Sequence, residues 1–194
     1  MEDSKAFKKI AYLSKDNASF SHILKHNGVL KLPTSQEDIF QYMAKIIIKQ
    51  QLSLQVANSI WSKLLATSNN DLFNFLTHEN TDILLNSGIS KRKLESMLRL
   101  KQEHLKDNLN KNISADNINE TKNYICSLYG FGEWSSEMIC LFYLGSPDIW
   151  SKSDATLNKA IKLLNIDNNF IDNCSPYKSY LALHLWKAID SKLI

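Results

Sequence analysis

Proline and glycine are both scarce in this chain, which has 3 prolines and 5 glycines among 194 residues. Proline interrupts helices because it lacks a backbone N–H and clashes with the preceding turn, so its scarcity leaves most of the chain free to be helical. Pro33, Pro147 and Pro176 all fall between segments with helical periodicity. Two of the five glycines, by contrast, lie two residues apart in the stretch LYGFGEWSSEM, residues 128–138. That concentration of glycine in one short segment needs an explanation.

Cysteine is equally sparse, and what is present has no metal-binding pattern. Cys126, Cys140 and Cys174 are odd in number and widely spaced, which excludes the usual zinc and iron–sulfur ligand sets. The five histidines also lack metal-ligand spacing. We therefore expect reduced thiols and no metal site formed by side chains. No glycine pattern of a nucleotide-binding P-loop or a dinucleotide-binding fold is present either.

Long apolar runs are absent as well. No run reaches the roughly 18 residues that a membrane span needs, and the N-terminal stretch MEDSKAFKKIAYLSK lacks the apolar core of a signal peptide. We expect a cytoplasmic protein without membrane contact. The net charge of +3 and the isoelectric point near 8.6 allow nucleic-acid binding without requiring it.

Most segments of the sequence have the apolar periodicity of an α-helix. Thr34 and Glu37 form the pattern of a capping box before the run at 39–47. Apolar residues in that run share one helical face, and a second stripe follows at Val56, Ala57, Ile60, Trp61 and Leu64. Alternating strand patterns are missing. The sequence therefore predicts an all-α fold of about ten helices joined by short loops.

The two close glycines lie between two of these predicted helices, an order that indicates a tight helical hairpin. Gly130 and Gly132 can both take positive φ, and neither has a side chain that would block a ligand. The first N–H groups of the second helix have no partner within that helix and lie at the positive end of its dipole. Such a turn binds anions, and phosphate above all. A plain turn between helices, with glycines that only relieve strain, explains the local pattern equally well.

Four segments together resemble one protein family. LYGFGEWSSEM resembles the hairpin of the helix-hairpin-helix DNA glycosylase superfamily (HhH-GPD), with Tyr129 in place of the usual proline. IIIKQQLSLQVANSIW, residues 46–61, resembles the Gln-Gln-Leu-Ser segment of its alkylation-repair branch, DNA-3-methyladenine glycosylase II.

The other two segments resemble the same branch. GISKRKLESMLRL, residues 88–100, resembles its middle helix. SPYKSYLALHLW, residues 175–186, resembles its Pro-Trp-Arg-Ser-Tyr segment, with Tyr177 and Lys178 in place of Trp and Arg. All four segments follow the family's order and spacing between about Leu32 and Ile189.

The resemblance implies a two-lobed helical HhH-GPD fold in which residues 1–194 form one catalytic unit of the short, minimal type. Residues 1–34 and 152–194 would form lobe 1, and residues 35–151, with the hairpin at 128–133, would form lobe 2. The active-site cleft would lie between the lobes.

The resemblance also implies the catalytic group. The family places an essential aspartate about twenty residues after the hairpin, where this chain has Asp154. Breaking an N-glycosidic bond builds positive charge on the sugar, which a fixed carboxylate stabilises. The alternative role of Asp154 is a helix N-cap, and both roles are compatible. Trp134 stands where bifunctional relatives have a lysine that forms a Schiff base, which implies a monofunctional enzyme that uses water.

Three residues would line the base pocket: Trp134, Met138 and Trp186. An electron-rich indole attracts the cationic purines that alkylation produces. Met138 departs from the tyrosine of some relatives and suits either a pocket or a core. Core packing on the last helix is the alternative for Trp186.

The predicted DNA contacts come from the hairpin and from the Gln-Gln-Leu-Ser segment, and they are Gln51, Leu52, Ser53, Gly130 and Gly132. A glycosylase pulls its target nucleotide out of the duplex, and an apolar wedge beside an amide fills the gap. Which of Gln51 and Leu52 is the plug stays open, and Leu52 could instead be a buried loop residue.

The predicted function is removal of alkylated purines, such as 3-methyladenine and 7-methylguanine, from double-stranded DNA. We expect a monomer without an organic cofactor, and the family admits a monovalent cation at the hairpin carbonyls. Two alternatives remain. One is a non-catalytic helix-hairpin-helix DNA-binding module, and the other is a glycosylase of the same fold for another base, such as hypoxanthine or a mismatched pyrimidine.

Overall fold

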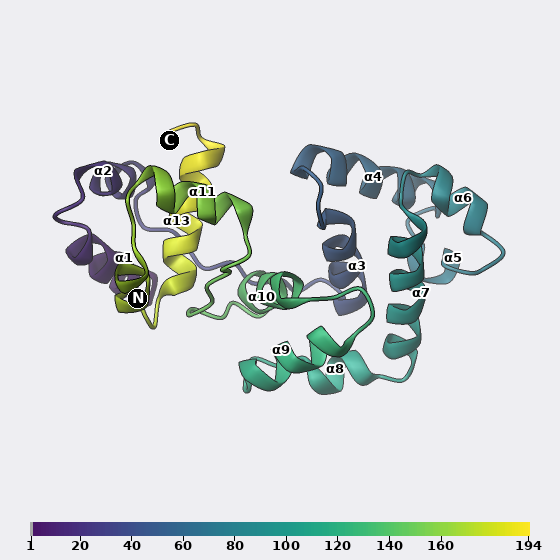
Figure 1. Cartoon of the computed structure of the whole chain (residues 1–194). Helices are drawn as coiled ribbons and strands as arrows, with labels where there is room; N and C mark the ends of the chain where they lie inside the picture. Colours follow the sequence, from purple (N-terminus) through teal and green to yellow (C-terminus); the bar gives the residue numbers. More distant parts are fainter. Residues whose placement is uncertain (1) are drawn as a thin grey trace. The chain divides into compact units, whose positions relative to one another are not determined.

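The computed structural model describes residues 2–194, and every regular element in that range is a helix (Figure 1). The all-α prediction is therefore confirmed. The helices are α1 (Glu2–Leu13), α2 (Ala18–Asn27), α3 (Ile39–Lys49), α4 (Leu54–Thr67), α5 (Leu72–Phe75), α6 (Thr81–Asn86), α7 (Lys91–Leu105), α8 (Asn108–Asn112), α9 (Ile118–Ser127), α10 (Glu133–Phe142), α11 (Ala155–Leu163), α12 (Asn168–Asn173) and α13 (Lys178–Asp190).

Two helices, α8 and α12, were not predicted. They have 5 and 6 residues, too few to repeat an apolar face, and each follows an aspartate. Asp167 accepts a hydrogen bond from the Phe170 N–H at 2.7 Å and so begins α12 as an N-cap. Within residues 2–194 no helix is long and apolar enough to span a membrane.

The predicted capping box at Thr34 and Glu37 is wrong. Helix α3 begins only at Ile39, where the Asp38 carboxylate accepts a hydrogen bond from the Gln41 N–H at 3.0 Å. Glu37 instead pairs with the Lys45 ammonium at 2.5 Å. Asp38 therefore replaces Thr34 as the N-cap, one turn later than predicted.

The described chain divides into two compact units. Unit 1 joins the segment up to Ser35 with Cys140–Ile194, and unit 2 is Gln36–Ile139. The segment 140–151, which the sequence assigns to lobe 2, is grouped here with unit 1. Hydrogen bonds to Ser179 of α13 tie this segment down: the Ser179 hydroxyl donates to the Ser146 carbonyl at 2.7 Å and accepts from the Ile149 N–H at 2.9 Å.

Unit 1 is built around α13, which contacts α1, α2, α11 and α12. Most of this helix is buried, including Tyr180, Leu181, Leu185 and Ala188. The adjoining helices contribute buried residues such as Ile10 to the same apolar core. The helix that carries Trp186 is therefore held by packing on several sides.

Unit 2 is built around α3, which packs against α4, α7 and α8. The predicted apolar face of α3 is buried, with Phe40, Met43 and Ile47 at 0% exposure. The Phe40 ring also meets Phe73 of α5 edge to face, with centroids 5.0 Å apart. This core positions the C-terminal end of α3, from which the Gln-Gln-Leu-Ser segment leaves.

Candidate active site and nucleic-acid interface

The two glycines of the hairpin serve different purposes. Gly130 has φ +86°, and a Cβ there would lie 2.1 Å from the Ser96 Oγ and 2.8 Å from the Ser96 Cβ. Gly132 has no positive φ, and a Cβ there would meet nothing within 4 Å. The expectation of positive φ therefore holds only for Gly130. Gly132 leaves an open approach to the start of α10, where the first backbone N–H groups have no acceptor within the helix.

The segment after α3, Gln50 to Ser53, is called the 50–53 loop from here on, and it is fixed to the hairpin. The Gln50 Nε2 donates to the Gly130 carbonyl at 2.9 Å and to the Ser135 hydroxyl at 3.0 Å. The Lys93 ammonium of α7 donates to the carbonyls of Ile48 and Gln50 at 2.7 and 3.0 Å. Partial burial lowers the pKa of Lys93. The hairpin and the 50–53 loop therefore form one connected element within unit 2.

The tip of the 50–53 loop is exposed. Gln51 takes a left-handed conformation with φ +58°, and Leu52 is 38% exposed. Ser53 begins α4 as its N-cap and accepts a hydrogen bond from the Val56 N–H at 3.4 Å. The wedge hypothesis needs an accessible Leu52, and the structure meets that need. The alternative, a leucine buried under a helix, is excluded.

Exposed apolar surface continues beyond Leu52 onto α4. Leu54 is 62% exposed and Val56 is 46% exposed. The predicted stripe at Val56, Ala57, Ile60, Trp61 and Leu64 is fully buried only at Ala57 and Leu64, and Val56 lies at the surface. Leu54 was not singled out at all, although its place in the run Leu52-Ser53-Leu54 offered a signal.

Asp154 is the N-cap of α11, and its carboxylate has two well-defined donors. Its Oδ1 accepts the Leu157 N–H at 2.8 Å and the Trp186 indole N–H at 3.1 Å. The side chain is half-buried. The capping role is thus confirmed, and the same two bonds fix the orientation of a carboxylate. A carboxylate held in this way can stabilise positive charge without reorganising during a reaction.

Two of the predicted site residues, Asp154 and Trp186, therefore meet within unit 1. The Trp186 ring also packs on Phe142, with centroids 5.4 Å apart and an angle of 34° between the rings. The other two predicted pocket residues lie one turn apart on α10, within unit 2. Trp134 is half-buried, and Met138 is 5% exposed.

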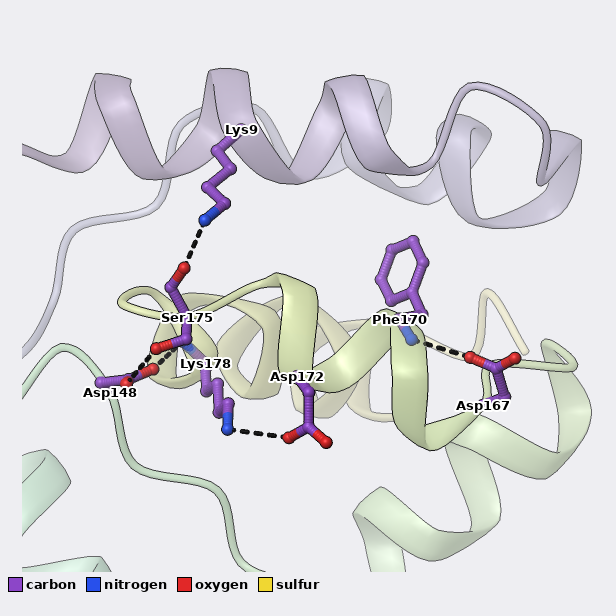
Figure 2. Close-up of polar contacts among 7 residues, drawn as sticks. All are labelled: Lys9, Asp148, Asp167, Phe170, Asp172, Ser175 and Lys178. Carbon is purple, nitrogen blue, oxygen red and sulfur yellow. Dashed lines mark hydrogen bonds and ion pairs between the residues drawn. The ribbon is translucent and has the colours of Figure 1, made fainter.

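The start of α13 is held by a carboxylate that sequence reasoning missed. Asp148 accepts hydrogen bonds from the Ser175 hydroxyl at 2.6 Å and from the Lys178 N–H at 3.1 Å, as Figure 2 shows. The Lys178 side chain pairs with Asp172 at 3.0 Å, and Lys9 donates to the Ser175 carbonyl (Figure 2). Only the residue type of Asp148, next to Pro147 in a predicted loop, hinted at such a role.

The described side chains offer little to bind a metal ion. Within residues 2–194 no group of three or more His, Cys, Asp or Glu side chains could hold a metal ion. The three cysteines are free thiols, and burial raises the pKa of Cys174 to about 12. Of the hairpin carbonyls, Leu128 accepts the Phe131 N–H at 3.1 Å and Gly130 accepts Gln50. Each carbonyl oxygen has a second lone pair, so the donor chemistry still fits a monovalent cation.

Solved structures share the helical fold of this chain. The 3-methyladenine DNA glycosylase Mag1 of Schizosaccharomyces pombe, solved in complex with abasic DNA, has a TM-score of 0.79 at 18% identity; the match covers 93% of this chain and 96% of that one. DNA-3-methyladenine glycosidase from Bacillus halodurans has a TM-score of 0.71 at 24% identity, with coverage of 91% and 86%.

Relatives found by sequence are also named as alkyl-base DNA glycosylases or glycosidases. DNA-3-methyladenine glycosylase 1 of S. pombe is 21% identical over 166 residues, which is 78% of this chain and 73% of the relative. The alkylbase DNA glycosidase-like protein mag2 of the same organism is 24% identical over 192 residues, with coverage of 91% and 90%. No family model matches the chain. The predicted fold and the predicted resemblance to the 3-methyladenine glycosylases are confirmed by these comparisons.

Proposed function

We propose that this protein is a monofunctional DNA glycosylase that removes alkylated purines, such as 3-methyladenine and 7-methylguanine, from double-stranded DNA. The observation that carries the proposal is the Asp154 carboxylate, which the Leu157 N–H and the Trp186 indole N–H hold in one orientation. The names of the sequence and structural relatives support the same activity and the same substrates.

Asp154 acts on the sugar. As the bond between the base and C1′ breaks, positive charge develops on the deoxyribose, and the negative carboxylate stabilises it. The departing base takes the bonding electrons, and a water molecule adds to C1′. The product is a free base and an abasic site in an intact strand.

The absence of strand cleavage follows from Trp134. A lyase step needs an amine that attacks C1′ and forms a Schiff base. The chain has an indole at the position where bifunctional relatives have that lysine, immediately after Glu133 at the start of α10. Water is therefore the nucleophile.

The substrate class follows from charge. Alkylation at N3 of adenine or N7 of guanine makes the base cationic, which weakens its glycosidic bond. An indole face binds a cation more tightly than it binds a neutral ring, and Trp134 and Trp186 supply two such faces. Met138 provides an adaptable apolar wall, so we expect several alkylated purines to be accepted.

The hairpin and the 50–53 loop hold the DNA. Backbone N–H groups at the start of α10 bind a phosphate through the open approach at Gly132. Leu52 enters the base stack with Gln51 beside it and keeps the target nucleotide flipped out. Ser53 fixes the loop to α4.

The proposed reaction has no step that requires an organic cofactor. A monovalent cation at the hairpin carbonyls would strengthen phosphate binding by the hairpin. Replacing potassium with a large organic cation at constant ionic strength is expected to weaken DNA binding without changing the chemistry. A monomer on damaged duplex DNA and a cytoplasmic location complete the proposal.

The proposal is tested by incubating the protein with duplex DNA that contains 7-methylguanine or 3-methyladenine. We expect release of the free base, detected by chromatography, with strand breaks that appear only after alkali treatment. Strand cleavage without alkali would contradict the monofunctional mechanism. Tight DNA binding without release of any base, including hypoxanthine and mismatched pyrimidines, would identify the protein as a binding module.

A further inference from the structure

The hairpin carries one side chain that the proposed mechanism does not use. Tyr129 stands where the resemblance leads one to expect proline, and it is 44% exposed. The guanidinium carbon of Arg99, on α7, lies 4.1 Å from the centroid of the Tyr129 ring. Stacking on an aromatic ring limits the rotation of a long cationic side chain.

A second contact fixes the same guanidinium. The Arg99 Nε donates to the Glu95 Oε1 at 2.6 Å, one turn earlier on α7. Among residues 2–194, no acceptor bonds the two terminal amino groups of Arg99, and the side chain is 58% exposed. An arginine has five N–H donors, and the pair of terminal amino groups fits two oxygens of a phosphate. Glu95 and Tyr129 thus orient the cation and leave its terminal N–H groups available.

These residues border a groove beside the hairpin. The groove has a volume of about 540 Å³ and is lined by Arg99, Lys106, Tyr124, Tyr129 and Phe131, among others. Its carboxylate, Glu103, is already engaged by the Asn108 amide at 2.7 Å and by Lys106 at 3.5 Å, and these contacts lower the pKa of Glu103. Arg99 is therefore the cation of the groove best placed to take an external anion.

We propose that Arg99, oriented by Tyr129 and Glu95, binds a backbone phosphate of the DNA strand that the hairpin holds. This inference rests on the proposed function, because it extends the phosphate site of the same hairpin. A tyrosine at position 129 makes the turn less rigid than a proline would, but its ring stacks against the Arg99 guanidinium. The contact adds affinity without sequence preference.

The test is the salt dependence of binding to duplex DNA. Each phosphate contact contributes about −0.9 to the slope of log K against log salt concentration. We expect Arg99→Ala to reduce the magnitude of the slope by about 0.9, so that raising salt from about 50 to about 200 mM weakens the variant roughly three- to fourfold less than the wild type. Tyr129→Ala, which frees the guanidinium, should weaken binding in the same direction by a smaller factor.

A matched control is Lys111→Ala on α8. Lys111 forms an exposed pair with Asp107 four residues earlier, at 3.6 Å, with no aromatic partner among the described residues. We expect its slope to equal that of the wild type. Thermal unfolding of each variant checks that the fold is retained.

The outcomes separate the two proposals. If the wild type releases alkylated bases but Arg99→Ala keeps the wild-type slope, the phosphate contact is refuted and the glycosylase proposal stands. If the wild type neither binds DNA nor releases a base, both are refuted. If inorganic phosphate at micromolar concentration shifts the Arg99 Nε–H resonance of the DNA-free protein, the site serves free phosphate instead of DNA.

Discussion

At the scale of single residues, Trp186 is connected to Asp154 by a hydrogen bond that a base-stacking role does not require. The indole N–H reaches the same Oδ1 that caps α11. Sequence comparison suggested only the aromatic face of Trp186. The polar edge of the ring gives it a second task, which is to orient the carboxylate.

Replacing Trp186 with phenylalanine separates the two tasks. The variant keeps an aromatic ring beside Phe142 but loses the N–H donor. A hydrogen bond to a charged group contributes about 1.5–3 kcal/mol, so we expect kcat for base release to fall about tenfold or more while DNA affinity stays unchanged. Single-turnover kinetics with excess enzyme measure this.

Trp150→Phe is the control, because Trp150 is partly buried in the same unit and its indole has no acceptor among the described residues. A wild-type rate for Trp186→Phe would show that only the ring matters and would return Trp186 to the base-pocket role alone.

Alanine substitutions at the two hairpin glycines should differ in their effects on stability and on DNA affinity. Gly130→Ala places a Cβ in positive φ and against Ser96, and we expect it to lower the free energy of unfolding by about 2 kcal/mol or more. Gly132→Ala meets open space, so its stability should change by less than about 0.5 kcal/mol. Its DNA affinity should nevertheless fall, because the methyl group stands on the approach to the α10 N–H groups. Urea denaturation and DNA titration of both variants check the pair. Equal stability losses would contradict this division of roles.

At the scale of elements, helix α13 contains a buried histidine that contacts α2. His184 is 1% exposed, and its Nδ1 lies 3.2 Å from the amide nitrogen of Asn27 on α2. Because an amide nitrogen can only donate, the ring must accept and stay neutral. Burial is the main cause that lowers the pKa of His184 from 6.5 to about 4, with a smaller contribution from the nearby Lys187.

This low pKa predicts how stability depends on pH. Between about pH 6.5 and pH 4 the unfolded chain binds a proton at His184 that the folded chain does not, so stability falls as the pH falls. The loss from this one group is on the order of 3 kcal/mol. Urea denaturation at pH 7 and pH 4.5 measures it. His184→Gln should show a flatter pH dependence, whereas His26→Gln, at an exposed position of α2, should follow the wild type. Parallel curves for all three proteins would refute the assignment.

Elements also show what the sequence could and could not reveal. Periodicity identified the buried face of α3, because seven of its eleven residues are buried and repeat regularly. It failed at Val56 near the start of α4, which belongs to the predicted apolar stripe but is 46% exposed. It also missed α8 and α12, which are too short to have a period. The bonds from Gln50 and Lys93 that join the 50–53 loop to the hairpin connect residues far apart in sequence, and local patterns do not encode such contacts.

At the scale of the whole molecule, the sequence predicted the helical fold, because helical periodicity runs through most of the chain and four segments, in order, resemble one family. The structure groups residues 140–151 with unit 1, and the bonds of Ser179 to Ser146 and Ile149 in this segment join residues far apart in sequence. Asp148 was missed because a single aspartate in a loop has no pattern. The roles of Asp154, Trp134, Met138 and the 50–53 loop in catalysis and DNA binding stay predictions.

The most direct test of the account is base release by Asp154→Asn from a duplex with one 7-methylguanine. Asparagine is as good an N-cap as aspartate, so α11 should remain intact while the negative charge is lost. Asp167→Asn, the same substitution at the N-cap of α12, is the matched control. We predict that Asp154→Asn binds the duplex as tightly as the wild type but releases the base about a hundredfold more slowly or worse, and that Asp167→Asn is unaffected. Release by Asp154→Asn at the wild-type rate would contradict the central claim.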